Sequence, residues 1–121
     1  MRAIICGGRD YWLTDEDLAY LDGLGLVEVV VGGASGADQD GAEWAREKGI
    51  PVRVFHAWWH DEGRAAGPKR NQRMADYLVN KRGAVAVIAF PGGKGTADMR
   101  RKATGMGIEV MEPHAKQTRL L

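Results

Sequence analysis

Four short apolar runs constrain this chain more than any other feature, because each is typical of a buried strand. The runs occupy residues 3–6, 27–31, 52–55 and 85–90, and three of them lead into paired glycines, the last one after a single proline. Helical patterns follow them along the chain. Apolar runs that alternate with helices at this spacing predict a parallel sheet with helices on both faces. We therefore expect a Rossmann-like α/β fold, a three-layer sandwich around a mostly parallel five-stranded sheet.

The periodicity predicts five strands and four helices. The predicted strands lie at 2–6, 27–31, 52–55, 84–90 and 108–111, and we expect the sheet order 3-2-1-4-5. The predicted helices run from Thr14 to Gly23 or Gly25, from 36 to 48, from 68 to 80 and from 96 to 105. Thr14 is the expected N-cap of the first helix, with Asp17 completing an acidic variant of the capping box.

Single residues predict the starts of the last two helices. Pro68 suits the first turn of the third helix, since proline lacks the N–H that this turn leaves unused. Gly95 is the expected N-cap of the fourth helix. Asp98 is then the third helical residue, where a carboxylate meets the positive end of the helix dipole. Met99 shares a helical face with Ala103, which places it in the predicted core.

The composition is that of a globular domain without a strong charge bias. The chain has 17 Lys plus Arg and 16 Asp plus Glu, which implies no bulk attraction to nucleic acid or membrane. We expect one domain over residues 1–121, with 113–121 as a loose tail. Cys6 is the only cysteine, which excludes an internal disulfide. Since neither a signal peptide nor a membrane span is evident, we expect a cytoplasmic protein.

The turn after the fourth apolar run predicts an anion site. The sequence Pro91-Gly92-Gly93-Lys94-Gly95-Thr96 joins a buried strand to a helix almost without side chains. Glycines let the backbone approach a ligand, and a helix N-terminus presents free N–H groups with a partial positive charge. An ordinary tight turn is the alternative. Because the carboxyl ends of parallel strands share one edge of a sheet, we expect the paired-glycine turns to form one phosphate pocket.

The turns differ from two familiar phosphate motifs. The chain has neither the G-x-G-x-x-G dinucleotide fingerprint after its first strand nor a G-x-x-x-x-G-K-[S/T] P-loop. The turns at 32–36 and 91–96 instead resemble the SLOG superfamily, which groups the Smf/DprA proteins with the Lonely Guy enzymes. Segments 8–10, 33–38, 66–71 and 95–99 resemble its small stand-alone YspA-like branch, which is often seen in bacteria and their phages.

This resemblance implies a nucleotide or nucleotide-derived ligand over the glycine-rich loops, such as an ADP-ribose-like or signalling nucleotide. It also implies a candidate hydrolase, because Lonely Guy enzymes cleave the N-glycosidic bond of nucleoside monophosphates. Arg70 matches the arginine of their R-K-x-x-M segment, with Asn71 in place of the lysine. Met99 stands where their P-G-G-x-G-T-x-x-E motif has its glutamate, and Asp98 lies one residue earlier. Arg70 and Asp98 are therefore the candidate catalytic residues of an N-glycosidase.

The candidate ligand-binding residues lie in or beside the predicted turns. The guanidinium of Arg70 is suited to donate two parallel hydrogen bonds to phosphate oxygens. Asp38 and Asp98 are candidates for ribose hydroxyls, with a helix-dipole contact as the structural alternative for each. Asp10 is a further ligand-site candidate, with a turn cap as its structural alternative. Trp58 is the candidate for stacking on a base, although the sequence does not separate it from Trp59. The full set is Gly7, Gly8, Arg9, Asp10, Gly32, Gly33, Ser35, Gly36, Asp38, Trp58, Arg70, Asn71, Pro91, Gly92, Gly93, Lys94, Gly95 and Thr96.

We expect the segment 56–67 to be a long loop over the ligand. His56 and His60 are four residues apart, but no third metal ligand stands at a suitable spacing, so neither a metal nor another cofactor is expected. The partners we expect are a nucleotide-type small molecule and further copies of the chain, as a homodimer or higher homo-oligomer. Single-stranded nucleic-acid binding, as in the Smf/DprA relatives, is a third functional hypothesis. It depends on the basic patch of Lys69, Arg70, Arg73, Lys81 and Arg82, and the near-neutral charge disfavours it.

Overall fold

The five strands pair in parallel in the order β3-β2-β1-β4-β5, which confirms the predicted topology. The computed structural model describes residues 1–115. The strands are β1 (Arg2–Cys6), β2 (Glu28–Val31), β3 (Val52–Val54), β4 (Val85–Ala89) and β5 (Glu109–Met111). Because β2 and β4 flank β1, the turn after β1 lies at the middle of the sheet edge.

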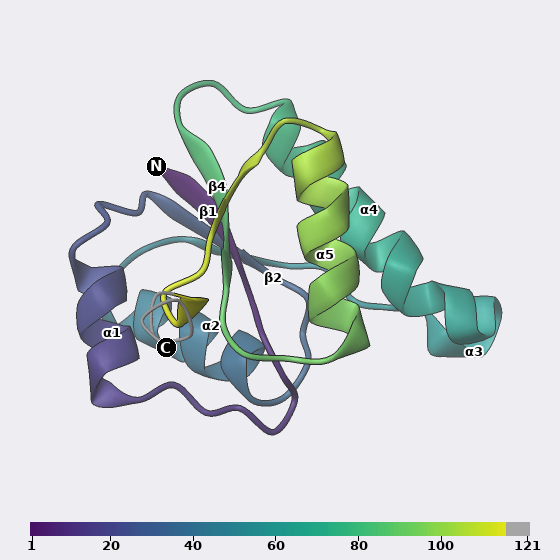
Figure 1. Ribbon diagram of the computed structural model, residues 1–121, viewed down its shortest axis with the longest axis horizontal. Helices are drawn as coiled ribbons and strands as arrows, with labels where there is room; N and C mark the ends of the chain where they lie inside the picture. The colour runs from purple at the N-terminus through teal and green to yellow at the C-terminus, as the bar shows by residue number, and fades with distance from the viewer. Residues whose placement is uncertain (116–121) are drawn as a thin grey trace.

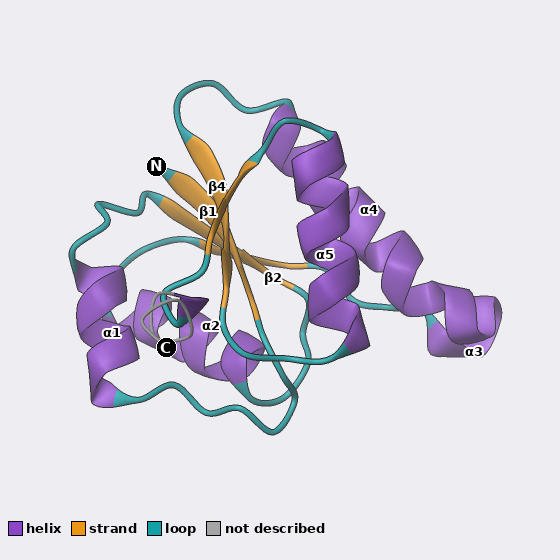
Figure 2. Cartoon of the chain, in the orientation of Figure 1, coloured by secondary structure: helices purple, strands orange, loops and turns teal. Residues whose placement is uncertain are grey.

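The helices form the two outer layers of the sandwich. They are α1 (Asp15–Asp22), α2 (Ala37–Glu47), α3 (Trp59–Glu62), α4 (Ala66–Val79) and α5 (Lys94–Gly105). Figure 1 shows α1 and α2 on one face of the sheet and α4 and α5 on the other, with α3 projecting beyond the start of α4. Figure 2 shows the strands between these helical layers. None of the helices within residues 1–115 is long and apolar enough to cross a membrane.

Alternation along the central strand builds two apolar cores. Successive strand residues point to opposite faces of a sheet. Ile5 belongs to the cluster that contains Trp44 of α2, whereas Ile4 belongs to the cluster that contains Leu78 of α4 and Met99 of α5. The burial of Met99 confirms its predicted place in the core.

Local sequence signals position the two helices on the first face. The hydroxyl of Thr14 accepts from the Asp17 N–H at 3.1 Å, and the Asp17 carboxylate accepts from the Thr14 N–H at 3.1 Å, which confirms the capping box. Gly41 brings α2 close to the sheet, because a Cβ there would lie 2.9 Å from a methyl carbon of Ile5. The capping box thus fixes where α1 begins, and the Gly41 contact sets how closely α2 approaches the sheet.

The predicted start of the third helix is wrong. The corresponding helix, α4, begins at Ala66, and the segment predicted as a loop contains α3 and a 3₁₀ turn (Gly63–Ala65). Pro68 is the third residue of α4 rather than its first. The first four N–H groups of a helix have no partner within it, so the missing N–H of proline is tolerated there as well.

The predicted start of the last helix is also wrong. The helix α5 begins at Lys94 with Gly93 as its N-cap, and the N–H of Ala97 closes the first turn onto the Gly93 carbonyl at 3.0 Å. Gly95 therefore lies inside the first turn. Asp98 becomes the fifth helical residue, so contact with the helix dipole does not explain its presence.

The turns after β1, β2 and β4 pack directly on one another. A Cβ on Gly36, whose φ is +73°, would collide with the carbonyl oxygen of Gly8. A Cβ on Gly92 would lie 2.7 Å from the backbone nitrogen of Gly8, and one on Gly7 would lie 2.6 Å from the Cβ of Ala37. The contacts between these three turns therefore require glycine at all three positions.

The end of the described chain is held against α1. The Nε2 atom of His114 lies 2.8 Å from Asp17 Oδ1 and 3.0 Å from the hydroxyl of Tyr11, which itself donates to Asp17 Oδ2 at 2.6 Å. His114 belongs to the predicted loose tail, of which residues 116–121 lie outside the described residues.

We expect Gly36→Ala to lower the free energy of unfolding by about 3 kcal/mol. A positive φ strains an alanine by about 1–2 kcal/mol, and the added methyl group also overpacks the neighbouring turn. Gly49→Ala is the matched control, because Gly49 has the same φ of +73° with nothing within 4 Å of the added Cβ. The free energy of unfolding of this control is expected to fall only by the cost of the positive φ. Urea denaturation measures both values, and equal losses would contradict the packing of the three turns.

Candidate functional site

The carboxyl edge of the sheet opens into a hollow of about 590 Å³, which we call the main cleft. Its walls come from the turn after β1, the start of α2, the start of α4 and the turn into α5, with Trp59 and Arg64 contributed by the α3 region. Ligands of open α/β sheets bind in the crevice at this edge, where the strand order reverses. The volume is within the range of small-molecule sites.

The amino end of α5 lines the main cleft with little side chain in the way. A Cβ on Gly93 or Gly95 would meet nothing within 4 Å, and Lys94 and Thr96 also border the cleft. The N–H groups of a first helical turn lack helical partners and carry a partial positive charge. This end of α5 is therefore suited to hold an anion.

Arg70 extends from α4 to the turn after β2. Its Nη1 atom donates to the carbonyl of Gly32, and its Nε atom donates to Asn71 Oδ1 at 3.0 Å. A Cβ on Gly32 would lie 2.6 Å from Nη1, so the guanidinium fills the space that the glycine leaves. A guanidinium carries five N–H donors, and these two bonds leave three for a ligand.

Asp38 lies in the first turn of α2, as predicted, and it borders the main cleft although it is only 6% exposed. Its Oδ2 atom accepts from the N–H of Gly32 at 3.0 Å. Burial raises the pKa of Asp38 to about 6, against the opposing effects of the Gly32 hydrogen bond and the charge of Arg70. A cleft carboxyl with a raised pKa is suited to exchange a proton near neutral pH.

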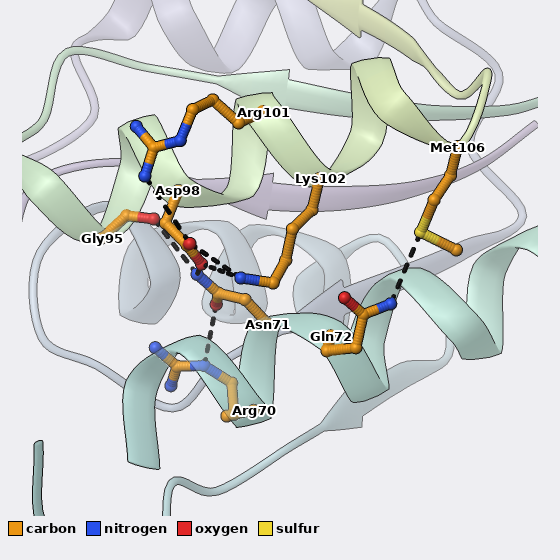
Figure 3. Close-up of polar contacts among 8 residues, drawn as sticks. All are labelled: Arg70, Asn71, Gln72, Gly95, Asp98, Arg101, Lys102 and Met106. Carbon is orange, nitrogen blue, oxygen red and sulfur yellow. Dashed lines mark hydrogen bonds and ion pairs between the residues drawn. The ribbon is translucent and has the colours of Figure 1, made fainter. Parts of the chain in front are cut away.

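Asp98 is held in a network between α4 and α5 (Figure 3). The Nζ atom of Lys102 lies 2.7 Å from both carboxylate oxygens, and Asn71 Nδ2 donates to Oδ2 at 3.0 Å. Burial alone raises the pKa of Asp98, but the hydrogen bonds from Lys102 and Asn71 outweigh it and hold the pKa below its usual range. Asp98 is therefore an ion-paired carboxylate rather than one ready to take a proton.

Asn71 joins this network to Arg70, as Figure 3 shows. The side chain is only 3% exposed, and its Nδ2 atom donates to the Gly95 carbonyl at 3.1 Å as well as to Asp98. Its Oδ1 atom accepts from Arg70. One amide thus fixes the position of Arg70 relative to the first turn of α5.

A second hollow of about 290 Å³, which we call the side cavity, adjoins the main cleft. Arg9, Ala34, Trp59 and Arg70 line both hollows. The remaining walls of the side cavity come from the turn after β2 and from the segment that follows β3. The two hollows are therefore neighbouring parts of one larger site.

The fold brings most of the predicted site residues to these two hollows. The main cleft is lined by Gly7, Gly8, Arg9, Asp38, Arg70, Asn71, Gly93, Lys94, Gly95 and Thr96, and by the candidate catalytic Asp98. The side cavity is lined by Gly32, Gly33 and Ser35, again with Arg9 and Arg70. Neither hollow is lined by Asp10, Gly36, Trp58, Pro91 or Gly92.

Trp59, rather than Trp58, borders both hollows. Its ring is half-exposed, and the guanidinium carbon of Arg9 lies 5.6 Å from the ring centroid. Trp58 instead contacts Arg73, whose guanidinium carbon lies 4.2 Å from that ring. Because α3 was not expected from the sequence, helical periodicity offered no way to separate the two neighbouring tryptophans.

The main cleft is lined by more cations than carboxylates. The cleft lining has two carboxyl groups: Asp98 pairs with Lys102 and lies 3.7 Å from Arg101, whereas Asp38 has no ion pair within 4 Å among the described residues. The sequence reasoning missed two of the cations, Arg64 and Arg101. The lining cations are Arg9, Arg64, Arg70, Lys94 and Arg101.

The predicted basic patch is partly neutralised. Lys69 and Arg73 lie 3.7 and 3.8 Å from carboxylate oxygens of Glu62 in α3. The Nζ atom of Lys81 lies 4.4 Å from the ring centroid of Tyr77. The two ion pairs with Glu62 reduce the charge that the patch offers to a nucleic acid, whereas Lys81 keeps its full charge on the Tyr77 ring.

The other reactive side chains of the described residues form neither a metal site nor a nucleophile. Within residues 1–115, no group of three or more His, Cys, Asp and Glu side chains is arranged to hold a metal ion. His56 lines the side cavity, whereas His60 lines neither hollow. Burial raises the pKa of Cys6 to about 12, so the thiol stays protonated and is no nucleophile.

A comparison with protein-family models finds no match to this chain, and a comparison with curated proteins finds none either. The assignment to a Rossmann-like α/β fold rests on the parallel strand order and the helical layers. Since one fold hosts many functions, a function must be inferred from the site itself.

We expect the carboxyl group of Asp38 to titrate near pH 6 and that of Asp98 below the usual aspartate range. Arg70→Ala raises the pKa of Asp38 further, because it removes a cation that favours the ionised form. Carbon-detected NMR titration of the side-chain carboxyl groups measures both values. Arg46→Ala, on the exposed face of α2, is the control and leaves both unchanged. An Asp38 midpoint near 4 would contradict the described burial.

The raised pKa of Asp38 also predicts the direction of a stability change. The folded chain binds this proton more tightly than the unfolded chain, so the contribution of Asp38 to stability is lost as the pH rises through about 6. Asp38→Asn removes that contribution. In the unchanged protein, Asp38 lowers the unfolding free energy at pH 7 relative to pH 5. The Asp38→Asn variant lacks this loss, so its unfolding free energy at pH 7 relative to pH 5 is expected to be higher than that of the unchanged protein.

Proposed function

We propose that the main cleft binds the phosphate of a nucleotide or nucleotide-derived ligand. One observation carries this proposal: the amino end of α5 and the Arg70 guanidinium border the same cleft. A helix N-terminus and an arginine guanidinium are both well suited to hold a phosphate. Asn71 connects them, since it bonds to Arg70 and to the Gly95 carbonyl.

The charges and the aromatic wall support a nucleotide over a simple anion. The excess of cations in the main cleft favours a ligand with negative charge. Trp59 presents a half-exposed ring on which a base can stack. Asp38 also borders the cleft and offers a carboxyl group for ribose hydroxyls. The resemblance to the SLOG superfamily points to the same class of ligand.

A nucleotide panel tests this proposal directly. The protein is incubated with AMP, CMP, ADP-ribose, NAD and cyclic nucleotides, and the retained and released compounds are separated by filtration and identified by mass spectrometry. Retention of an intact compound supports binding. If no compound is retained and none changes the melting temperature, the proposal is wrong.

Arg70→Ala is expected to weaken binding of a retained nucleotide by about 10- to 100-fold. Hydrogen bonds between charged groups contribute about 1.5–3 kcal/mol. Arg70→Lys keeps the positive charge but loses the paired N–H donors of the guanidinium, so it is expected to give an intermediate loss of affinity. Isothermal titration calorimetry measures the affinities, and thermal unfolding checks that each variant folds. Arg46→Ala removes the same charge outside both hollows, so an equal loss in that control would reject the assigned role of Arg70.

A second candidate function is hydrolysis of the N-glycosidic bond of a nucleoside monophosphate. The raised pKa of Asp38 inside the main cleft favours it. Ionised Asp38 would take a proton from water as the water oxygen attacks ribose C1′, while the C1′–N bond breaks. The departing base keeps the bonding electrons and takes a proton from solvent, and Asp38 then releases its proton to solvent. Asp98 was the candidate from the sequence, but its ion pair with Lys102 makes it a poor proton acceptor.

If the cleft hydrolyses nucleotides, Asp38→Asn is expected to abolish release of free base, whereas Asp98→Asn reduces it less. The value of kcat/KM is expected to fall as the pH drops below about 6, because protonation removes the base. Chromatography of base and ribose phosphate measures the reaction. Base release that survives Asp38→Asn would reject this role.

A further inference from the structure

The side cavity differs in charge from the main cleft that it adjoins. Its lining includes Arg9, Arg70 and His56, while the described residues that line it include no carboxylate. Two permanent cations and an imidazole border a hollow of about 290 Å³. Such a lining favours a compact anion over a neutral group.

We propose that the side cavity receives a second phosphate of the same ligand, so that the ligand is a nucleotide with two or more phosphate groups. This inference rests on the proposed function of the main cleft. The side cavity alone is near the lower limit of volumes for ligand pockets. It therefore fits one group of a ligand rather than a whole nucleotide.

Arg70 is placed to serve both hollows. The guanidinium lines each of them, and its bonds to the Gly32 carbonyl and to Asn71 use two of its five N–H donors. Arg9 also lines both hollows. The turn that carries Arg9 is held in place because the Ser35 hydroxyl donates to the Arg9 carbonyl at 3.1 Å. A ligand that spans the boundary thus meets cations on both sides.

His56 distinguishes the side cavity from the main cleft. Its imidazole lies against the turn after β2, since a Cβ on Gly33 would lie 3.1 Å from His56 Nδ1. The backbone of His56 is held by α4, because Arg73 Nη2 donates to its carbonyl at 3.4 Å. His56 lines only the side cavity, so a change there affects the second phosphate alone.

The test compares nucleotides that differ only in their second phosphate. Nucleoside 5′-monophosphates, 5′-diphosphates and 3′,5′-bisphosphates are titrated into the protein by calorimetry. We expect at least one two-phosphate form to bind about tenfold more tightly than its monophosphate. The two-phosphate form that binds more tightly shows whether the two phosphates of the ligand are contiguous or separated by the sugar.

His56→Ala is expected to remove most of this gain while changing monophosphate affinity by less than twofold. His56→Glu places a negative charge in the side cavity and is expected to make the two-phosphate form bind no better than the monophosphate. His60→Ala and His60→Glu are the matched controls, because His60 is an exposed histidine that lines neither hollow. Circular dichroism confirms that the variants fold.

The outcomes separate this inference from the proposed function. If monophosphates bind but a second phosphate does not increase the affinity, the inference is overturned and the proposed function stands. The same holds if the His56 variants lower the affinity for monophosphates and for two-phosphate nucleotides equally. If no nucleotide of any class binds, the proposed function fails as well. A gain that disappears only in the His56 variants supports the second phosphate site.

Discussion

Three backbone turns touch one another at the carboxyl edge of the sheet, and both hollows depend on that contact. The N–H of Gly8 donates to the Pro91 carbonyl at 2.8 Å, and the N–H of Ala37 donates to the Gly8 carbonyl at 3.3 Å. The hydroxyl of Ser35 adds a bond to the Arg9 carbonyl. The turns after β1, β2 and β4 therefore form one unit, whose shape is set before any ligand arrives. A preorganised wall of this kind loses little entropy on binding.

The glycines of these turns have different structural roles. Gly36 and Gly92 make room for a neighbouring turn, so their lack of a side chain serves the fold. Gly93 and Gly95 border open space at the start of α5, so their lack of a side chain leaves the backbone accessible to a ligand. Gly32 has a third role, because its lack of a side chain makes room for the Arg70 guanidinium. A glycine-rich motif read as a whole does not separate these roles.

The sequence predicts the strand order because apolar runs, turn lengths and helical periodicity all agree on it. It misplaces the start of α5, since Gly93 and Gly95 are both acceptable N-caps and only the Ala97 bond to Gly93 decides between them. The pairing of Asp98 with Lys102 could have been predicted from their spacing of four residues on one helix. The bonds of Asn71 could not, because they join α4 to α5 and depend on how the two helices pack.

Asp38 and Asp98 show how the cleft gives different chemistry to the same type of residue. Asp98 receives hydrogen bonds from a cation and an amide, so its negative charge is stabilised and its affinity for a proton is low. Asp38 is more deeply buried and receives hydrogen bonds from backbone N–H groups, so burial dominates and its affinity for a proton is high. Of these two carboxyl groups, Asp38 is therefore the one whose protonation changes near neutral pH. Asp98 instead stabilises the wall formed by α4 and α5, against which a phosphate would rest.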